Sequence, residues 1–218
     1  MYTALIVAAG SGTRTRLPFN KMFYEIKKKP LIMYSVDRFL SDPDCEEIII
    51  VHAANDASRM ATLVKNYGKI KLISGGETRQ ESVYAGLKLA ASRFVLIHDG
   101  ARPNVSKASI DNLKRAVLDQ GAATLAVPVK DSLVSVENNF VTGYIKRDIT
   151  LAVQTPQAFI TEEILKAHIL AHNSDTTHTD DVSVYLDKFN KDVRVVLGDE
   201  ENIKVTTKTD LQLMEALL

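Results

Sequence analysis

The segment LIVAAGSGTRTRLPFNK, residues 5–21, determines how the rest of the chain is interpreted. It begins with a short apolar run that predicts a buried strand, and it continues into a loop that contains Gly10 and Gly12. Glycines lack a Cβ atom, so backbone N–H groups in such a loop can approach phosphate oxygens closely. Arg14 and Lys21 would add fixed positive charge beside the same phosphates. The segment therefore predicts a phosphate-binding loop directly after the first strand.

Two better-known glycine motifs do not match this loop. The dinucleotide-binding pattern G-x-G-x-x-G would need a glycine where Thr15 stands, and no Gly-Lys pair follows at the spacing of a P-loop. What remains is A-A-G-x-G-x-R followed, after six residues, by a lysine. This pattern resembles that of the sugar-nucleotide pyrophosphorylase and cytidylyltransferase superfamily. The alternative interpretation is a surface turn with solvated basic side chains.

Length and composition limit the classes of protein to which the chain can belong. It has 218 residues, 45% of them hydrophobic, so we expect one domain with a sizeable core over residues 1–218. Lys plus Arg and Asp plus Glu each number 27, so no overall basic field attracts nucleic acid. The single cysteine, Cys45, excludes an intrachain disulfide and suits a reducing compartment. We expect no signal peptide, no membrane span and a cytoplasmic location.

Strand-like and helix-like segments alternate through the first part of the chain. We expect strands at 4–8, 47–52, 69–74, 94–98 and 122–127, with helices at 31–40, at 56–67, from 79, and around 110–117. This rhythm predicts an α/β fold with a doubly wound, mostly parallel, Rossmann-like sheet. Such sheets bind ligands at the carboxyl ends of their strands. The loops after the first, third and fourth strands should therefore converge on one crevice.

The alternation stops after Pro128. Residues 133–136 and 140–145, with a turn between them, predict a β-hairpin that no helix covers. An uncovered hairpin needs another surface, so we expect a protruding arm, about residues 131–149, that packs on a second subunit. The chain then returns to a helix from 161, a short helix after 179–181, a strand at 194–197 and a last helix opened by a capping box at 207–210.

Four further segments carry groups that suit phosphate transfer. Residues 75–82 form a glycine loop that could read the edge of a base, although a plain strand-to-helix turn is an equal alternative. Asp99 could orient a ribose hydroxyl and Arg102 could steady it, with a structural ion pair as the alternative. Arg147 could grip a phosphate by two parallel hydrogen bonds, and Lys204 supplies a compact positive charge before the last helix.

The histidines are interpreted as structural. His98 ends the fourth strand and is expected to be a packing residue, because attack of a phosphate on a phosphoanhydride needs no general base. His168 and His172 have a spacing that zinc ligands can have, but no third ligand lies near them in sequence.

Taken together, these segments resemble the 2-C-methyl-D-erythritol 4-phosphate cytidylyltransferase family over essentially the whole chain. The matching motifs, in order, are A-A-G-S-G-T-R, G-G-E-T-R-Q-E-S-V, H-D-G-A-R-P, V-P-V-K-D-S, Q-T-P-Q-A-F, T-D-D and N-I-K-V-T-T. The resemblance implies transfer of a cytidylyl group from CTP to the methylerythritol phosphate, with release of pyrophosphate, in the non-mevalonate isoprenoid pathway. It also implies Mg²⁺, held mainly by the CTP phosphates, and a homodimer with exchanged arms.

The same resemblance implies roles for individual residues. Arg14 and Lys21 would stabilise transition-state charge, and Arg147 and Lys204 would position the acceptor phosphate. Arg147 and Thr155 would act in the neighbour's site. The residues implied to hold CTP are Ala8, Ala9, Gly10, Gly12, Gly76, Glu77, Arg79 and Ser82. Those implied to serve the acceptor are Asp99, Arg102, Ser132, Thr155 and Thr179. No side chain is implied as a metal ligand.

The chain departs from the family's usual residues at a few positions. Glu77 stands where aspartate is usual, Ser132 where threonine is usual, and Thr150-Leu151 where a Leu-Trp pair is usual. The last change lies near the expected acceptor pocket, so a ribitol 5-phosphate cytidylyltransferase of teichoic acid or capsule synthesis is the alternative. Ala101 disfavours it, because that family generally has valine there. A catalytically idle nucleotide-binding module is a further alternative, disfavoured by the retained basic residues.

Overall fold

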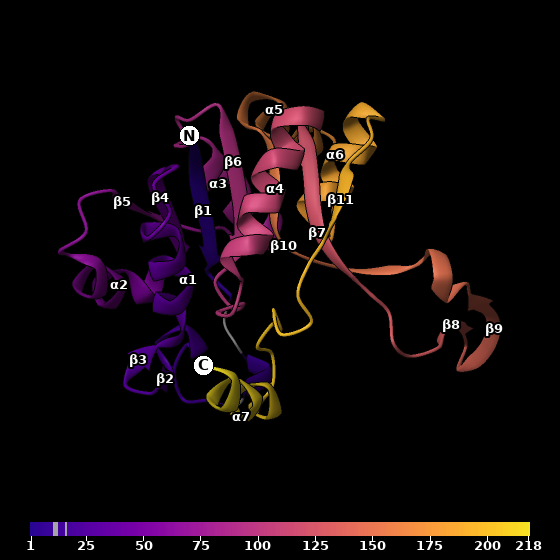
Figure 1. The fold of residues 1–218 in the computed structure, drawn as a ribbon, viewed down its shortest axis with the longest axis horizontal. Helices are drawn as coiled ribbons and strands as arrows, with labels where there is room; N and C mark the ends of the chain where they lie inside the picture. Colours follow the sequence, from indigo (N-terminus) through magenta and orange to yellow (C-terminus); the bar gives the residue numbers. More distant parts are fainter. Residues whose placement is uncertain (11–12, 16) are drawn as a thin grey trace.

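The computed structural model describes residues 1–10, 13–15 and 17–218. Over these residues its centre is a seven-stranded sheet in the order β11-β7-β10-β6-β1-β4-β5 (Figure 1). The strands are β1 (Tyr2–Ala8), β4 (Cys45–His52), β5 (Ile70–Ser74), β6 (Phe94–Asp99), β7 (Ala122–Pro128), β10 (Leu151–Ile160) and β11 (Arg194–Leu197). Strand β10 runs antiparallel to β6 and β7, and the other neighbouring strands pair in parallel. The expected α/β fold with a mostly parallel sheet is confirmed.

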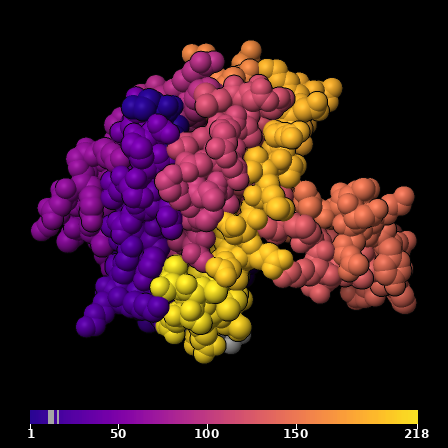
Figure 2. Space-filling model, in the orientation of Figure 1, coloured from indigo at the N-terminus to yellow at the C-terminus, as the bar shows by residue number. Residues whose placement is uncertain are grey.

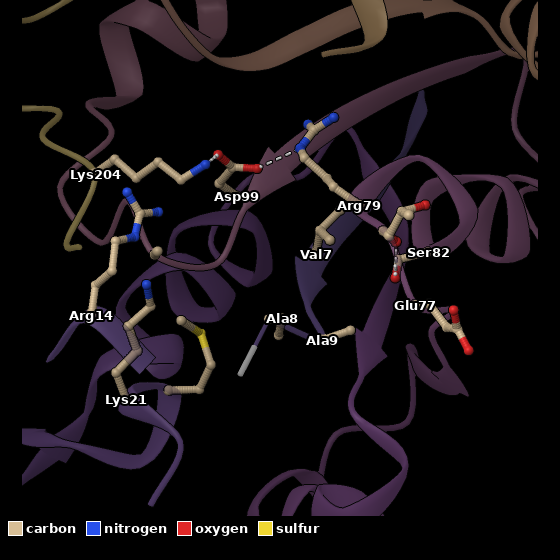
Figure 3. A pocket seen from close by; sticks show the side chains of 15 residues that line it. Val7, Ala8, Ala9, Arg14, Lys21, Glu77, Arg79, Ser82, Asp99 and Lys204 are labelled. Carbon is tan, nitrogen blue, oxygen red and sulfur yellow. Dashed lines mark hydrogen bonds and ion pairs between the residues drawn. The ribbon is translucent and has the colours of Figure 1, made fainter. Parts of the chain in front are cut away.

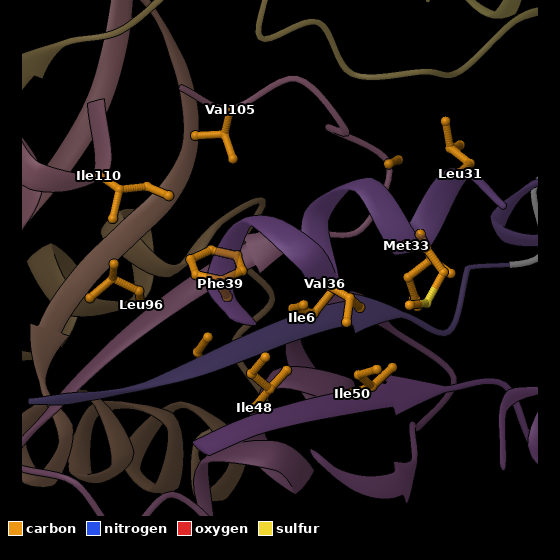
Figure 4. Packing of buried hydrophobic residues seen from close by; sticks show 14 of the residues in the cluster. Ile6, Leu31, Met33, Val36, Phe39, Ile48, Ile50, Leu96, Val105 and Ile110 are labelled. Atoms are coloured by element: carbon orange, nitrogen blue, oxygen red, sulfur yellow. The ribbon is translucent and has the colours of Figure 1, made fainter. Parts of the chain in front are cut away.

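Helices cover both faces of the sheet. They are α1 (Leu31–Leu40), α2 (Ala57–Val64), α3 (Arg79–Leu87), α4 (Lys107–Gln120), α5 (Thr161–Asn173), α6 (Asp181–Phe189) and α7 (Lys208–Leu217). Ile6 and Ile48 pack in one cluster with Val36 and Phe39 of α1 and with residues of α2, α4 and α7 (Figure 4). Alternate strand residues, such as Leu5, pack in a second cluster with α3, α5 and α6. Burial on both faces explains the continuous apolar runs of the parallel strands.

The strand order reverses beside β1, and this reversal positions the site. The chain passes from β1 to β4 and β5 on one side and then returns to β6 on the other side of β1. Because these strands are parallel, the loops that follow β1, β5 and β6 leave the sheet at the same edge. A ligand site is therefore expected at this edge.

The sequence pattern does not predict strand β10, although it lies in the middle of the sheet. Pro156 interrupts it, and a proline normally argues against a central strand because it lacks an N–H donor. The pairing with β7 shifts register between Val153 and Gln157, so Pro156 falls in an irregular part of the ladder. The buried Gln157 side chain accepts hydrogen bonds from the backbone N–H groups of Asp181 and Val182. The hydrogen-bond partners of Gln157 are distant in sequence, so no local pattern predicts them.

The predicted hairpin is confirmed. Strands β8 (Leu133–Glu137) and β9 (Phe140–Ile145) form a separate two-stranded sheet that projects from the body (Figures 1 and 2). Asn138 and Asn139 connect them with φ angles of 49° and 67°, a left-handed conformation that asparagine tolerates in two-residue hairpin turns. A second small hairpin, β2 (Glu25–Ile26) and β3 (Lys29–Pro30), lies before α1.

The helix boundaries agree with the sequence in most places. The capping box between Thr207 and Asp210 opens α7 as expected. Helix α2 is shorter than the expected 56–67, because a 3₁₀ turn, η3 (Ala54–Asp56), precedes it and it ends at Val64. Three further 3₁₀ turns are η1 (Thr13–Thr15), which follows β1, η2 (Lys21–Phe23), and η4 (Arg147–Ile149) at the foot of the arm. Within the described part of the chain, no helix is both long and apolar enough to span a bilayer.

Candidate active site

A cavity of about 260 Å³ opens at the carboxyl end of β1 and β6 (Figure 3). Its wall is built by the loop after β1, the turn η2, the loop after β5 with the start of α3, the end of β6 and the segment before α7. The residues expected to hold CTP that line it are Ala8, Ala9, Gly10, Gly76, Glu77, Arg79 and Ser82. Arg14, Lys21, Asp99 and Lys204 line it as well. The predicted convergence of the three loops is confirmed.

Basic side chains from the two ends of the chain meet on one side of this cavity. Figure 3 shows Arg14, Lys21 and Lys204 extending toward the same region. Lys21 is only 9% exposed, and its Nζ atom donates a hydrogen bond of 2.8 Å to the carbonyl oxygen of Val205. Burial lowers the pKa of Lys21, and the nearby charges of Lys204 and Arg14 lower it further. Three like charges this close repel one another, so an anion bound among them would be stabilised.

The position of Lys21 follows from its local sequence. Asn20 accepts a hydrogen bond of 3.1 Å from the backbone N–H of Met22 and so starts the turn η2. The Asn20 side chain also donates to Oδ2 of Asp56 at 2.7 Å. The turn therefore holds Lys21 against the body of the protein, and its ammonium group faces the cavity (Figure 3).

Asp99 is a buried carboxylate held between two cations. Its Oδ2 lies 2.6 Å from Nζ of Lys204, and its Oδ1 lies 3.1 Å from Nε of Arg79. Burial alone would raise the pKa of Asp99, but the charges of Arg79 and Lys204 outweigh it and hold that pKa well below its usual range. Asp99 is thus an ionised hydrogen-bond acceptor at neutral pH.

The glycine loop after β5 lets α3 approach the first strand closely. A Cβ atom on Gly75 would lie 2.5 Å from Oγ of Ser82 and 2.7 Å from Cβ of Ala9, so a larger residue would displace one of these elements. Helix α3 begins with a capping box between Thr78 and Glu81. Ser82 is buried in the wall, and its hydroxyl donates to the carbonyl oxygen of Thr78 at 2.9 Å.

A second, more open hollow of about 430 Å³ adjoins the first and shares Arg79, Asp99 and Lys204 with it. Besides Asp99, three residues expected to serve the acceptor line it, namely Arg102, Thr155 and Thr179. Thr155 was expected to serve the neighbour's site, but in this chain it lies beside its own Asp99, whose backbone N–H donates to the threonine hydroxyl at 3.0 Å. Arg102 donates to the carbonyl oxygen of Asn202 at 2.7 Å.

The structure does not bring Arg147 and Ser132 to these hollows within one chain. Both residues are exposed at the foot of the arm, and neither lines the cavity or the second hollow. Nη1 of Arg147 donates to the carbonyl oxygen of Lys130 at 3.1 Å. The arm points away from the body (Figure 1). Gly12, also expected at the site, lies outside the described residues.

Sequence reasoning missed the part that Asp181 plays. This fully buried carboxylate at the start of α6 lies 2.8 Å from Nη2 of Arg79, whose Nε atom faces Asp99. Its other oxygen lies 3.2 Å from Nε2 of His168. Asp181 therefore orients Arg79 toward Asp99. The T-D-D motif marks the position, but no sequence spacing indicates a partner on a distant helix.

The described residues do not form a ready-made metal centre. No group of three or more His, Cys, Asp or Glu side chains among them is arranged around a common point. Asp99, the buried carboxylate in the described cavity wall, is already paired through both oxygens. The site consists instead of fixed cations and close backbone, an arrangement suited to holding two anions together.

Comparison with known proteins identifies the same architecture. A sequence model of the family described as 2-C-methyl-D-erythritol 4-phosphate cytidylyltransferase matches residues 2–218. Proteins of that name from Shouchella clausii and Bacillus licheniformis are 41% and 38% identical over 221 residues, covering 100% of this chain and 96% and 95% of their own. A solved structure from Anaerococcus prevotii, a 4-diphosphocytidyl-2C-methyl-D-erythritol synthase, has a TM-score of 0.87 at 29% identity, covering 99% of this chain and 96% of that one. One from Francisella tularensis, a 2-C-methyl-D-erythritol 4-phosphate cytidylyltransferase, has a TM-score of 0.85 at 30% identity and covers 100% of both chains.

Proposed function

Because the chain belongs to the 2-C-methyl-D-erythritol 4-phosphate cytidylyltransferase family, we propose that the cavity beside β1 is its catalytic centre. The enzyme transfers a cytidylyl group from CTP to 2-C-methyl-D-erythritol 4-phosphate and releases pyrophosphate, a step of isoprenoid biosynthesis. The observation that carries the placement is the convergence of Arg14, Lys21 and Lys204 opposite the glycine loops.

The reaction is a single displacement at phosphorus. An oxygen of the acceptor's phosphate attacks the α-phosphorus of CTP, and the bond from that phosphorus to the oxygen bridging to the β-phosphate breaks. Pyrophosphate leaves with the electron pair of that bond. Both reactants are anions, so positioning them and neutralising their repulsion supply most of the catalysis.

The basic side chains would neutralise the repulsion between the two anions. Arg14 and Lys21 face the region where the triphosphate would lie, and they would stabilise the charge that grows on the departing pyrophosphate. The hydrogen bond to Val205 holds Lys21 before substrate arrives, so little reorganisation is needed during the reaction. Lys204, paired with Asp99, would receive the acceptor's phosphate on the side of the second hollow.

The two glycine loops would hold the nucleotide. Residues 8–10 and 76–79 line the cavity, where a base and a triphosphate can approach their backbone closely. The backbone N–H groups of Glu77 and Thr78 already donate to the Glu81 carboxylate. The hydroxyl of Ser82 can exchange its bond to Thr78 for one to the cytosine edge. Asp99 would accept a hydrogen bond from a hydroxyl between the nucleotide and the acceptor.

The site fits a Mg²⁺ ion that arrives on the nucleotide. Mg²⁺ keeps several waters and binds substrate phosphates with few protein carboxylates. In the described cavity wall, Asp99 is already engaged by Arg79 and Lys204, so it is not free to bind the ion. The CTP phosphates would therefore hold the ion, which would neutralise part of their charge.

We further propose a homodimer in which the arms are exchanged, so that Arg147 enters the neighbour's site. The arm carries exposed apolar side chains, among them Phe140 at 74% and Tyr144 at 80% exposure, which a second subunit would cover. A cytoplasmic location is proposed as well, since Cys45 is a buried free thiol that suits a reducing compartment.

The experiment that tests the function compares two acceptors. Pyrophosphate release is measured with CTP, Mg²⁺ and either 2-C-methyl-D-erythritol 4-phosphate or ribitol 5-phosphate. Turnover that favours methylerythritol phosphate supports the proposed site and substrate. A preference for ribitol 5-phosphate would establish the alternative, and tight CTP binding without turnover on either acceptor would indicate a nucleotide-binding module.

A further inference from the structure

His98 is fully buried at the end of β6 and lines neither of the two hollows. Its Nε2 atom lies 3.0 Å from the carbonyl oxygen of Arg102, and its Nδ1 atom lies 3.2 Å from the hydroxyl oxygen of Thr155. Both ring nitrogens therefore meet groups that belong to the wall of the site. A residue that only filled space would need neither contact.

These contacts assign the proton on the ring. A carbonyl oxygen can only accept, so Nε2 of His98 carries the proton and donates to Arg102. In the neutral ring Nδ1 is then the acceptor, and the Thr155 hydroxyl donates to it. Burial lowers the pKa of His98 to about 4, which agrees with a neutral ring at neutral pH. The Thr155 oxygen keeps its lone pairs for the backbone N–H of Asp99, which donates to it at 3.0 Å.

A fourth hydrogen bond closes the circuit. The backbone N–H of Arg102 donates to the carbonyl oxygen of Asp99 at 2.9 Å, which forms the turn after β6. The described pairing of β10 with β6 begins only at Gln157, opposite Ile97, so the Thr155 hydroxyl takes the place of a ladder partner for Asp99. Every donor in the circuit has one acceptor, and the direction of the Thr155 hydroxyl bond depends on which nitrogen of His98 carries the proton.

We propose that His98 is a positioning residue for cytidylyl transfer, which with Thr155 closes a ring of four hydrogen bonds that fixes the turn carrying Asp99 and Arg102. This inference rests on the proposed function, because Asp99 and Arg102 matter to cytidylyl transfer only if the two hollows hold the substrates. The ring acts on the acceptor side of the site, because its members Arg102 and Thr155 line the second hollow and not the first cavity.

The first test measures which nitrogen of the His98 imidazole carries the proton, and it does not depend on enzyme activity. In ¹⁵N-histidine-labelled full-length enzyme at neutral pH, long-range proton–nitrogen NMR should show His98 with a protonated Nε2 and a bare Nδ1. The signal is assigned by its loss in His98→Gln. A ring protonated on Nδ1, or on both nitrogens, would overturn the proposal whatever the enzyme's activity.

The second test measures kinetics in matched variants. Thr155→Val keeps the side-chain shape and removes the hydroxyl, so kcat should fall about ten- to a hundredfold with little change in KM for CTP, the scale of a small misplacement at a reacting centre. Thr155→Ser should restore most of the rate. Thr124→Val, a buried threonine on the adjacent strand whose hydroxyl bonds only a neighbouring carbonyl, should leave kcat unchanged.

Coupling between the two side chains separates positioning from direct contact with substrate. His98→Phe keeps an aromatic ring opposite Phe39 and removes both ring nitrogens, and it should lower kcat to a similar extent as Thr155→Val. The double variant should lose little more than either single one, because each substitution already opens the same ring. Fully additive losses, or a kcat in Thr155→Val equal to that of Thr124→Val, would overturn the proposal. If the wild-type enzyme lacked transfer activity but His98 had the expected tautomer, the proposed function would be wrong although the ring of hydrogen bonds is present.

Discussion

Nζ of Lys204 lies 2.6 Å from Oδ2 of Asp99, so the segment before α7 is joined to the end of β6 inside the cavity wall. The other oxygen of Asp99 faces Arg79, whose Nη2 atom is also paired with Asp181. A single carboxylate thus holds two cations in place without neutralising the rest of the cluster. This arrangement links the stability of the fold to the charge of the site.

Asp99→Asn should therefore change how stability depends on pH. The lowered pKa of Asp99 means that its charge stabilises the fold fully above the unfolded-state value, roughly 3.9, and that this contribution is lost as the pH falls through the folded-state value. The difference in free energy of unfolding between wild type and Asp99→Asn should be largest at neutral pH and shrink at about pH 3. Urea unfolding at both pH values measures it. An equal difference at both would contradict the pairing.

Lys21→Ala should lower kcat by about a hundredfold or more, the scale for losing one preorganised charge contact in a transition state. Lys69→Ala is the matched control, because its ammonium group also donates to backbone carbonyls, those of Cys45 and Leu40, but at the start of β4. Steady-state turnover at saturating CTP compares the two variants. Turnover of Lys21→Ala near that of Lys69→Ala would remove Lys21 from the mechanism.

Mixing two inactive variants should restore activity if the arms are exchanged. Lys21→Ala lacks a residue of its own site, and Arg147→Ala lacks a residue that it would lend to its neighbour. Random reassociation makes half of the dimers mixed, each with one intact site, so about a quarter of wild-type activity should return. The assay is pyrophosphate release after denaturation and joint refolding. No recovery would place Arg147 in the site of its own chain.

Charged residues on the arm should separate the subunits. Phe140 and Tyr144 are the two most exposed apolar side chains of β9, and the double substitution of both by Asp should place two charges in the proposed interface. Sedimentation should then show a monomer. Leu118→Asp on α4 is the control, because Leu118 is 66% exposed and lies outside the arm. A wild-type monomer at micromolar concentration would itself contradict the dimer.

The sequence predicts much of the fold because its strongest signals are local. Alternation of apolar runs with helical spacing indicates the parallel strands and most helices. The asparagine pair at 138–139 and the capping box at 207–210 mark their own turns. The glycine and basic loops around Gly10 and Gly76 are also local patterns, and they do line the cavity.

What the sequence does not reveal depends on contacts between distant residues. Strand β10 is not predicted because a proline and a glutamine, Pro156 and Gln157, are unfavourable in a central strand. In the structure, the ladder with β7 is irregular at Pro156, and the start of α6 donates a hydrogen bond to the Gln157 side chain. The pairing of Arg79 with Asp181 joins two helices, and the contact of His98 with Thr155 joins two strands. No spacing in a single sequence indicates such pairs. From the sequence alone, His98 can therefore be interpreted only as a packing residue.

The central claim is that the acceptor's phosphate attacks the α-phosphorus of CTP directly within the cavity lined by Arg14, Lys21 and Lys204. The most direct test is the stereochemical course with CTP that carries sulfur on the α-phosphorus in one configuration. A single in-line displacement inverts that configuration, and inversion is the result we predict. Retention would require two displacements through a covalent nucleotidyl-enzyme, and it would contradict the account.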